Sequence, residues 1–128
     1  MHMPRVISVV DDDASIRVAI DSLLRSHGYT VCTFASAAEL LQSPQLDDTS
    51  CVITDVRMPD MSGVELQTAL RSRAHSMPFI FISAFPDNSA RVQALRDGAD
   101  CFLYKPFDAA TLIKCVDTAI AAHDAKHR

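Results

Sequence analysis

The 128-residue chain repeats one pattern five times: a short apolar run rich in β-branched residues, a turn, and a segment with helical periodicity. The apolar runs are mostly continuous rather than alternating, which indicates strands buried on both faces. We predict strands at Arg5–Val10, Thr30–Phe34, Cys51–Thr54, Phe79–Ile82 and Cys101–Tyr104. Strands that alternate with helices favour right-handed crossovers and a parallel sheet covered by helices on both sides.

The segments between the strands carry the start and stop signals of helices. The predicted N-capping residues are Asp13, Ser36, Ser62 and Asp108, and glycines at 28 and 98 follow two of the helix ends. The fourth helix is expected from about Asn88 to Asp97. The expected fold class is therefore α/β, a doubly wound three-layer sandwich with ligands bound at the carboxyl ends of the strands.

Composition limits the partners of this chain. It has 16 acidic and 12 basic side chains and a formal net charge of −4, so direct nucleic-acid binding by this domain is disfavoured. The length fits a single domain over residues 1–128, with a core at about 5–122. The longest apolar runs fall far short of the roughly 18 residues that span a bilayer, and the N-terminus has no signal-peptide core. We therefore expect no membrane partner and a cytoplasmic location.

The cysteines and two of the histidines are potential metal ligands, but both sets have an ordinary structural interpretation. The cysteines, which show no C-x-x-C spacing, are Cys32, Cys51, Cys101 and Cys115. Three of them lie in apolar stretches, so we expect all four to be reduced, structural thiols. His123 and His127 have the i, i+4 spacing of metal ligands but no third ligand nearby, so we interpret them as cations at a helix C-terminus.

Four of the five predicted strands end in chemically reactive residues. These are Asp11 and Asp12 after the first strand, Asp55 after the third, Ser83 after the fourth and Lys105 after the fifth. Each alone has an ordinary explanation as a turn, cap or strand-end residue. Because the carboxyl ends of parallel strands meet at one edge of the sheet, we expect three carboxylates, one hydroxyl and one ammonium to lie together.

This set of groups is suited to phosphoryl transfer. Neighbouring carboxylates need a cation to remain ionised together, and oxygen ligands favour a hard ion such as Mg²⁺, which also binds phosphate oxygens. A carboxylate can then attack phosphorus and form an aspartyl-phosphate. Ser83 can donate a hydrogen bond to the phosphoryl group, and Lys105 can balance its charge.

Four motifs together carry a resemblance to a known family. They are Val9-Val-Asp-Asp-Asp-x-x-x-Arg17, Asp55-Val-Arg-Met-Pro-Asp-Met-Ser-Gly63, Ile82-Ser-Ala84 and Lys105-Pro-Phe107. In this combination the chain resembles the CheY-like receiver domain of two-component response regulators over almost its whole length. The resemblance implies a flavodoxin-like (βα)₅ fold with strand order 2-1-3-4-5. It also implies a phosphorylation-activated signalling switch, which is not an enzyme beyond self-phosphotransfer and autodephosphorylation.

The resemblance also implies roles for individual residues. Asp55 would accept a phosphoryl group from a histidine kinase, and Mg²⁺, for which Mn²⁺ can substitute, would bind Asp11, Asp12, Asp55 and the backbone carbonyl of Arg57. Ser83 would be the switch hydroxyl and Lys105 the phosphate-binding lysine. Phe102 would be the aromatic switch residue, and the Lys105–Pro106 peptide bond would be cis.

Further expectations concern the mouth of the site and the output. The side chains of Arg57 and Phe85 should lie at the mouth and modulate the lifetime of the phosphoryl group. Phosphorylation should alter the surface of the fourth helix, fifth strand and fifth helix, and so strengthen homodimerisation or the binding of an output domain or partner.

Three alternative functions fit these residues less well. A phosphohydrolase of the haloacid-dehalogenase type needs D-x-D spacing, which Asp11 and Asp13 satisfy, but it also needs a cap segment that the chain lacks. An FMN carrier needs a Ser, Thr and Gly loop after the first strand, where three acids would repel phosphate. A degenerate receiver that only binds partners is disfavoured by the intact set of acids, hydroxyl and lysine.

Overall fold

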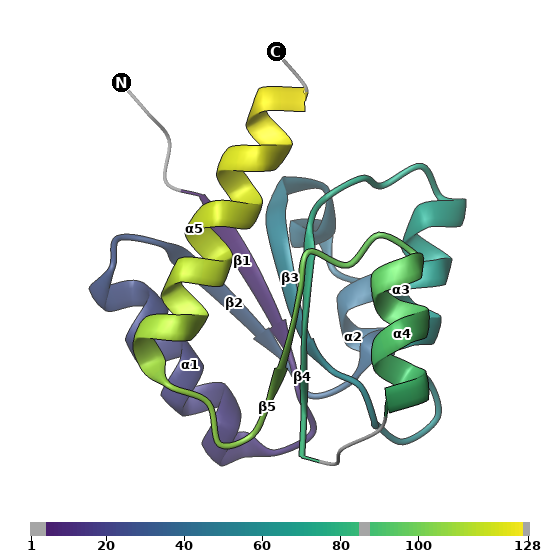
Figure 1. Ribbon diagram of the computed structural model, residues 1–128, viewed down its shortest axis with the longest axis horizontal. Helices are drawn as coiled ribbons and strands as arrows, with labels where there is room; N and C mark the ends of the chain where they lie inside the picture. The colour runs from purple at the N-terminus through teal and green to yellow at the C-terminus, as the bar shows by residue number, and fades with distance from the viewer. Residues whose placement is uncertain (1–4, 85–87, 127–128) are drawn as a thin grey trace.

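The computed structural model describes residues 5–84 and 88–126, and its five strands form one parallel sheet of order β2-β1-β3-β4-β5 (Figure 1). The strands are β1 (Val6–Val10), β2 (Thr30–Phe34), β3 (Thr49–Asp55), β4 (Phe79–Ser83) and β5 (Cys101–Tyr104). The helices are α1 (Ala14–Ser26), α2 (Ala37–Leu41), the 3₁₀ helix η1 (Pro44–Asp48), α3 (Gly63–Ser72), α4 (Asn88–Arg96) and α5 (Ala109–Lys126). The predicted doubly wound fold is confirmed.

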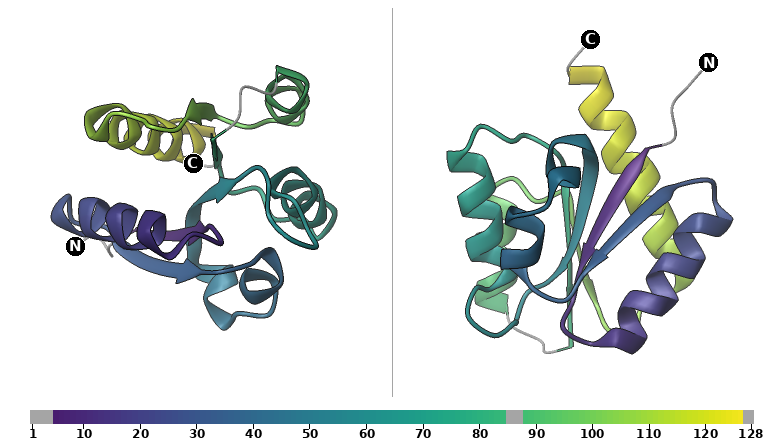
Figure 2. Two further views of the ribbon diagram at one scale, coloured as in Figure 1. Left: turned by 90° about the horizontal axis from the view of Figure 1, so that it is seen from below. Right: turned by 180° about the vertical axis from the view of Figure 1, so that it is seen from behind.

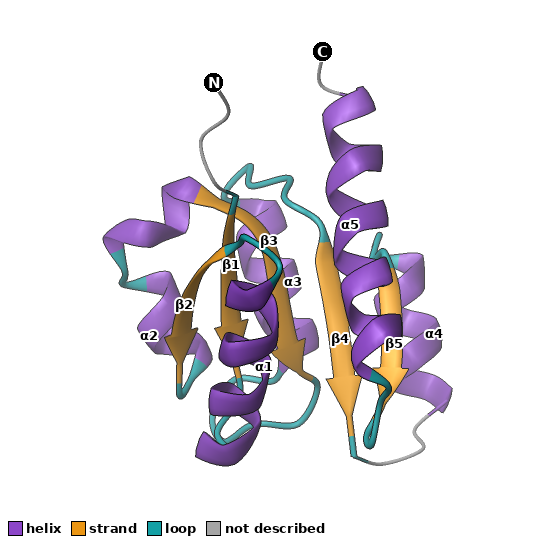
Figure 3. Cartoon of the chain, turned by 90° about the vertical axis from the view of Figure 1, so that its left-hand side faces the viewer, coloured by secondary structure: helices purple, strands orange, loops and turns teal. Residues whose placement is uncertain are grey.

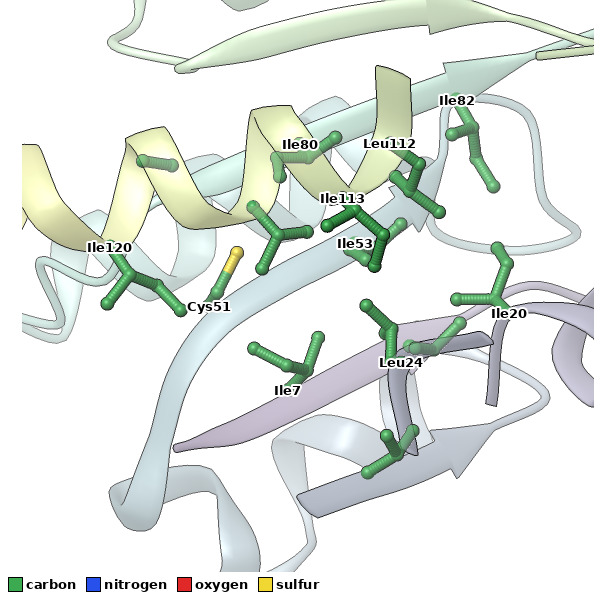
Figure 4. Close-up of a cluster of buried hydrophobic side chains, with 14 residues drawn as sticks. Ile7, Ile20, Leu24, Cys51, Ile53, Ile80, Ile82, Leu112, Ile113 and Ile120 are labelled. Carbon is green, nitrogen blue, oxygen red and sulfur yellow. The ribbon is translucent and has the colours of Figure 1, made fainter. Parts of the chain in front are cut away.

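Helices cover both faces of the sheet. Figure 2 shows α1 and α5 on one face and α2, α3 and α4 on the other, and Figure 3 shows α1 and α5 side-on. Alternation along the strands divides the core between these layers. In β4 the side chains of Ile80 and Ile82 pack toward α1 and α5, whereas Phe79 and Phe81 pack toward α2, α3 and α4. Figure 4 shows the first of these two clusters, with Ile53 of β3 at its centre.

Side-chain caps fix where two helices begin near the edge of the sheet. The Asp13 carboxylate accepts the Ser15 backbone N–H at 2.9 Å, which caps α1. Ser62 and Glu65 form a full capping box at the start of α3, with Ser62 Oγ accepting the Glu65 N–H at 3.1 Å. Asp13 directly follows Asp11 and Asp12, and Ser62 ends the loop that follows Asp55, so the two caps set the direction in which the chain leaves the site.

The structure differs from the sequence-based prediction around β3. This strand begins at Thr49, two residues before the predicted start, and it directly follows η1. The hydroxyl groups of Thr49 and Ser8 lie 2.7 Å apart as a buried hydrogen-bonded pair. Because the hydrogen bond satisfies both hydroxyl groups, the polar Thr49 can occupy a buried position in the strand. A prediction based on apolar runs does not include such a residue.

The prediction of four reduced cysteines is wrong for one pair. Cys101 on β5 and Cys115 on α5 form a disulfide, and their Cα atoms lie 6.3 Å apart. The two residues are 14 positions apart in sequence and meet only because α5 packs back on the sheet. Cys32 and Cys51 are free thiols, as expected.

None of the helices in the described ranges is long and apolar enough to cross a membrane. Phe85 and His127, for which the sequence analysis gives expectations, lie outside the described residues.

Candidate functional site

The carboxylates and the lysine predicted from the strand ends lie together. They are at the edge of the sheet where the strands end, which is the lower edge in Figure 1. Asp11 and Asp12 follow β1, Asp55 is the last residue of β3, and Lys105 follows β5. The Lys105 Nζ atom donates to Asp11 Oδ2 at 3.0 Å and to Asp55 Oδ2 at 3.1 Å. One ammonium therefore joins the ends of β1 and β3 across the sheet.

Burial sets the electrostatics of this contact. Asp11 is fully buried, and burial raises the pKa of its carboxyl; the nearby Asp55 charge adds to the rise, whereas hydrogen bonds from the Asp13 N–H and Lys105 oppose it. Burial alone would lower the pKa of Lys105, but its hydrogen bonds to Asp11 and Asp55 outweigh burial, so that pKa is raised. Lys105 therefore remains a cation between the two acids.

The acidic residues could hold a metal ion. Carboxylate oxygens of Asp11, Asp12 and Asp55 all lie within 4.8 Å of one another. In the ionised state the three carboxylates carry more charge than the Lys105 ammonium, which contacts Asp11 and Asp55, can balance. An oxygen-only donor set with excess negative charge suits a hard divalent cation such as Mg²⁺. The residues present therefore fit this metal.

Backbone contacts hold the site residues in place. The Arg57 N–H donates to Asp55 Oδ1 at 3.2 Å, so the backbone of residue 57 lies beside the central carboxylate. The Arg17 guanidinium donates to the Asp11 carbonyl at 2.6 Å. The Lys105 N–H donates to the Ser83 carbonyl at 2.7 Å, which links the ends of β4 and β5. Arg17 belongs to the motif that follows the first strand, but the motif alone does not predict its contact with the Asp11 carbonyl.

Gly63 is a positioning residue that sequence reasoning missed. A Cβ atom at this position would overlap the Asp55 carbonyl oxygen and lie 3.2 Å from the Phe81 ring. The Gly63 N–H donates to the Val56 carbonyl at 2.9 Å, so the start of α3 is held against the end of β3. A glycine directly after a capping serine was the available signal, because only glycine permits such a close backbone approach.

The two residues named as switches lie at different depths. Ser83 ends β4 and is 1% exposed. Phe102 on β5 is half-buried and belongs to the layer of α2, α3 and α4, where its ring stacks on Phe81 with centroids 6.1 Å apart. The exposed Tyr104 ring meets Phe102 edge-on at 5.4 Å. The Lys105–Pro106 peptide bond is cis.

Comparisons with known proteins agree with this geometry. The model of the response regulator receiver domain matches residues 7–117, and the chain therefore belongs to this family. Nodulation protein W of Bradyrhizobium diazoefficiens is 42% identical over 123 residues, which are 96% of this chain and 54% of that protein. Transcriptional regulatory protein TdiR of Thauera aromatica is 41% identical over 115 residues, 90% of this chain and 51% of that protein.

Solved structures show the same fold. The crystal structure of FixJ-N has a TM-score of 0.83 and 32% identity, and the match covers 94% of this chain and 96% of that one. The structure of response regulator StyR has a TM-score of 0.89 and 35% identity over 98% of this chain and 63% of that one. Members of this family are signalling proteins rather than classical enzymes, and membership implies phosphorylation-dependent signalling.

The chain spans about half the length of the curated relatives that it matches. Receiver domains typically bind Mg²⁺, in keeping with the acidic cluster of Asp11, Asp12 and Asp55.

Proposed function

We propose that this receiver domain accepts a phosphoryl group on Asp55 from a sensor histidine kinase in a Mg²⁺-dependent reaction. In response, the surface of α4, β5 and α5 changes and controls an output domain or partner. The observation that carries the proposal is the contact of Lys105 with both Asp11 and Asp55, at 3.0 and 3.1 Å, beside a third carboxylate. This arrangement joins a nucleophile, a cation and potential metal ligands at one site.

Asp55 is the nucleophile in the proposed reaction. A carboxylate oxygen of Asp55 attacks phosphorus, a P–O bond forms, and the bond from phosphorus to the kinase imidazole nitrogen breaks. Lys105 then balances the charge of the phosphoryl oxygens, and the Ser83 hydroxyl donates a hydrogen bond to one of them.

Asp11, Asp12, Asp55 and the Arg57 carbonyl would hold Mg²⁺. When bound, Mg²⁺ neutralises the carboxylates and accepts phosphoryl oxygens as further ligands. The buried Asp11 supports this assignment because burial raises the pKa of its carboxyl even beside Lys105, and a bound cation would stabilise the ionised form. The side chain of Arg57, exposed at the edge of the site, and that of Phe85 would modulate the lifetime of the phosphoryl group.

Intact-mass measurement tests the assignment of Asp55. Incubation with acetyl phosphate and Mg²⁺ should add one phosphoryl group to the natural protein, and Asp55→Asn should gain none. Asp60→Asn is the matched control, because Asp60 lies in the loop that follows Asp55, with φ of 69°, a conformation that asparagine also adopts. It should label like the natural protein. Labelling of Asp55→Asn, or full labelling with the metal chelated, would contradict the mechanism.

Separate variants test the response to phosphorylation. Ser83→Ala and Lys105→Ala should uncouple phosphorylation from the change at the output surface, because they remove the two groups that would contact the phosphoryl oxygens. Amide chemical shifts on β5 and α4, recorded with and without the phosphoryl mimic beryllofluoride, measure this coupling. Lys114→Ala, at an exposed position of α5, is the control and should respond like the natural protein. A full response in Ser83→Ala would remove Ser83 from the switch.

A further inference from the structure

Cys101 and Cys115 join two elements of the proposed output surface. Cys101 is the first residue of β5, next to Phe102, and Cys115 lies on α5. Their Cα separation of 6.3 Å is within the 4.4–6.8 Å range typical of disulfides, and their sulfur atoms are bonded. The bond closes a loop that contains Lys105 and the start of α5.

The surroundings of this pair differ from those of the core thiol. Cys101 and Cys115 are half-buried and pack at the border of the cluster between the sheet and α5. Cys51 is fully buried in the same cluster, where burial raises the pKa of its thiol well above the ordinary value. A small thiol reagent can therefore approach the half-buried pair more readily than the enclosed Cys51, because exchange requires access to a sulfur atom.

We propose that Cys101 and Cys115 are a thiol–disulfide modification site that exchanges reversibly with low-molecular-weight disulfides of the glutathione class. In the oxidised form the bond ties α5 to β5 covalently, and in the reduced form only side-chain packing holds them together. Figure 3 shows α5 lying over β4 and β5, so the bond connects the helix to the edge strand beneath it. The chemistry is independent of phosphorylation, whereas any effect on signalling rests on the proposed function.

The exchange balances in two steps. One cysteine thiolate attacks a sulfur of glutathione disulfide, forms a mixed disulfide and releases one glutathione thiolate. The second cysteine thiolate attacks the protein sulfur of the mixed disulfide, forms the Cys101–Cys115 bond and releases the second glutathione. Two electrons pass from the protein thiols to glutathione disulfide, and the two thiol protons pass to the released glutathione. Excess glutathione reverses both steps.

Thiol tagging tests the chemistry on the whole chain. The protein is fully reduced, incubated with glutathione disulfide and glutathione at several ratios, quenched with acid, unfolded and alkylated with a maleimide. Reduced protein should take four maleimides and oxidised protein two, since the chain has four cysteines. After tryptic digestion without reduction, peptides 97–114 and 115–126 should be joined, because cleavage follows Arg96 and Lys114 but not Lys105 before Pro106.

Variants give this test its controls. Cys32→Ser should still form the cross-link, whereas Cys101→Ser and Cys115→Ser should lose it. Stable glutathione adducts in the natural protein, a cross-link through Cys32, or four maleimides at every glutathione ratio would overturn the proposal.

Hydrogen exchange tests the physical consequence. Amides in residues 109–126 should exchange more slowly in the oxidised natural protein than in the reduced protein. Cys115→Ser should exchange equally under both conditions, and equal exchange in the natural protein would overturn the tie between α5 and β5. No phosphodonor is present in either measurement, so a failure of Asp55 labelling and a failure of the disulfide site are distinguishable.

Discussion

Asp12 and Asp13 are neighbours in the chain, yet their carboxylates have different roles. Asp12 offers an oxygen to the acidic cluster with Asp11 and Asp55. Asp13 caps α1 and accepts hydrogen bonds from the Ser15 N–H and hydroxyl at 2.9 and 2.7 Å, and these bonds lower the pKa of its carboxyl. The direction of the chain after β1 thus separates a potential metal ligand from a helix cap.

Because the two carboxylates have different roles, substituting them should affect different properties of the protein. Asp12→Ala should weaken Mg²⁺ binding by at least about tenfold, the lower end of the loss seen when only an outer-shell partner of a metal is removed. Asp13→Ala should leave Mg²⁺ affinity nearly unchanged but lower the thermal unfolding midpoint through loss of the cap. Titration followed by NMR gives the affinities, and equal affinities for the two variants would show that their roles are misassigned.

Asp100 gives a prediction for the pH dependence of stability. Burial raises the pKa of this carboxyl, and the hydrogen bond from the Phe79 N–H at 3.2 Å opposes the rise only in part. Because the folded protein holds the proton more tightly than the unfolded chain, this group contributes stability at low pH. The contribution is lost as pH rises through the folded-state pKa.

Asp100→Asn should remove this loss of stability at higher pH, because the asparagine amide does not ionise. Its oxygen can still accept a hydrogen bond from the Phe79 N–H. The difference in unfolding free energy between the variant and the natural protein should therefore shift in favour of the variant as pH rises from about 4, near the ordinary aspartate pKa, toward 7. Urea denaturation at several pH values measures it, and the raised pKa of Asp11 cancels because both proteins share it. A difference that does not vary with pH would contradict the prediction.

The positions of site residues could be predicted where the chain itself defines a strand end. Asp11, Asp55 and Lys105 each follow a clear apolar run, and parallel strands end at one edge, so their proximity follows from the pattern. The Arg17 contact with the Asp11 carbonyl depends on how α1 turns back over β1. The pairing of Cys101 with Cys115 depends on how α5 packs on β5. Neither contact can be predicted from the local sequence.

At the scale of elements, prediction succeeded where local chemistry and tertiary packing agree. Ser62 and Glu65 have capping-box spacing, and both hydrogen bonds of the box are present. β3 begins two residues early because the hydroxyl of Thr49 finds a buried partner in Ser8 on the neighbouring strand. The boundary of a strand thus depends on a partner strand that a reading of β3 alone does not include.

The approach of α3 to β3 predicts a sharp effect at Gly63. Gly63→Ala should lower the unfolding free energy by roughly 1–3 kcal/mol, because the new methyl would overlap the Asp55 carbonyl and force a backbone shift. Phosphorylation by acetyl phosphate should also slow, since Asp55 would move with its carbonyl.

Gly28→Ala is the control for the substitution of Gly63. Gly28 has a φ of +89° and no atom within 4 Å of an added Cβ, so alanine there strains the backbone without touching the site. It should reduce stability but leave the phosphorylation rate unchanged. If Gly63→Ala phosphorylated at the natural rate, the close contact would not position Asp55.

At the scale of the whole molecule, α4 is the helix with least burial in its layer. Its one fully buried residue is Ala94, whereas Val92 and Leu95 are 42% and 39% exposed. Tyr104 on the edge strand β5 is 39% exposed as well. A helix held by so little apolar contact can move at low cost, and its exposed apolar side chains offer area for a partner.

The proposed coupling from site to surface would have a direct route, because Ser83 ends the strand that leads toward α4 and its carbonyl accepts the N–H of Lys105, which follows β5. A phosphoryl group that attracts Ser83 and Lys105 would bias both elements. The response cannot exceed the difference in stabilisation between the two states, typically 1–3 kcal/mol or about 5- to 150-fold in affinity. Beryllofluoride with Mg²⁺ should therefore shift the amide signals of residues 84–107. It should also strengthen self-association by about 5- to 150-fold.

Charge at the exposed apolar positions distinguishes this surface from others. Leu95→Glu should weaken the beryllofluoride-dependent self-association, because a dimer through α4 and β5 would bury the new carboxylate without a partner. Val18→Glu is the matched control, since Val18 on α1 is 69% exposed and lies on the opposite face of the sheet. Sedimentation measures both. Equal association of Leu95→Glu and the natural protein, or shifts confined to the site, would place the output surface elsewhere.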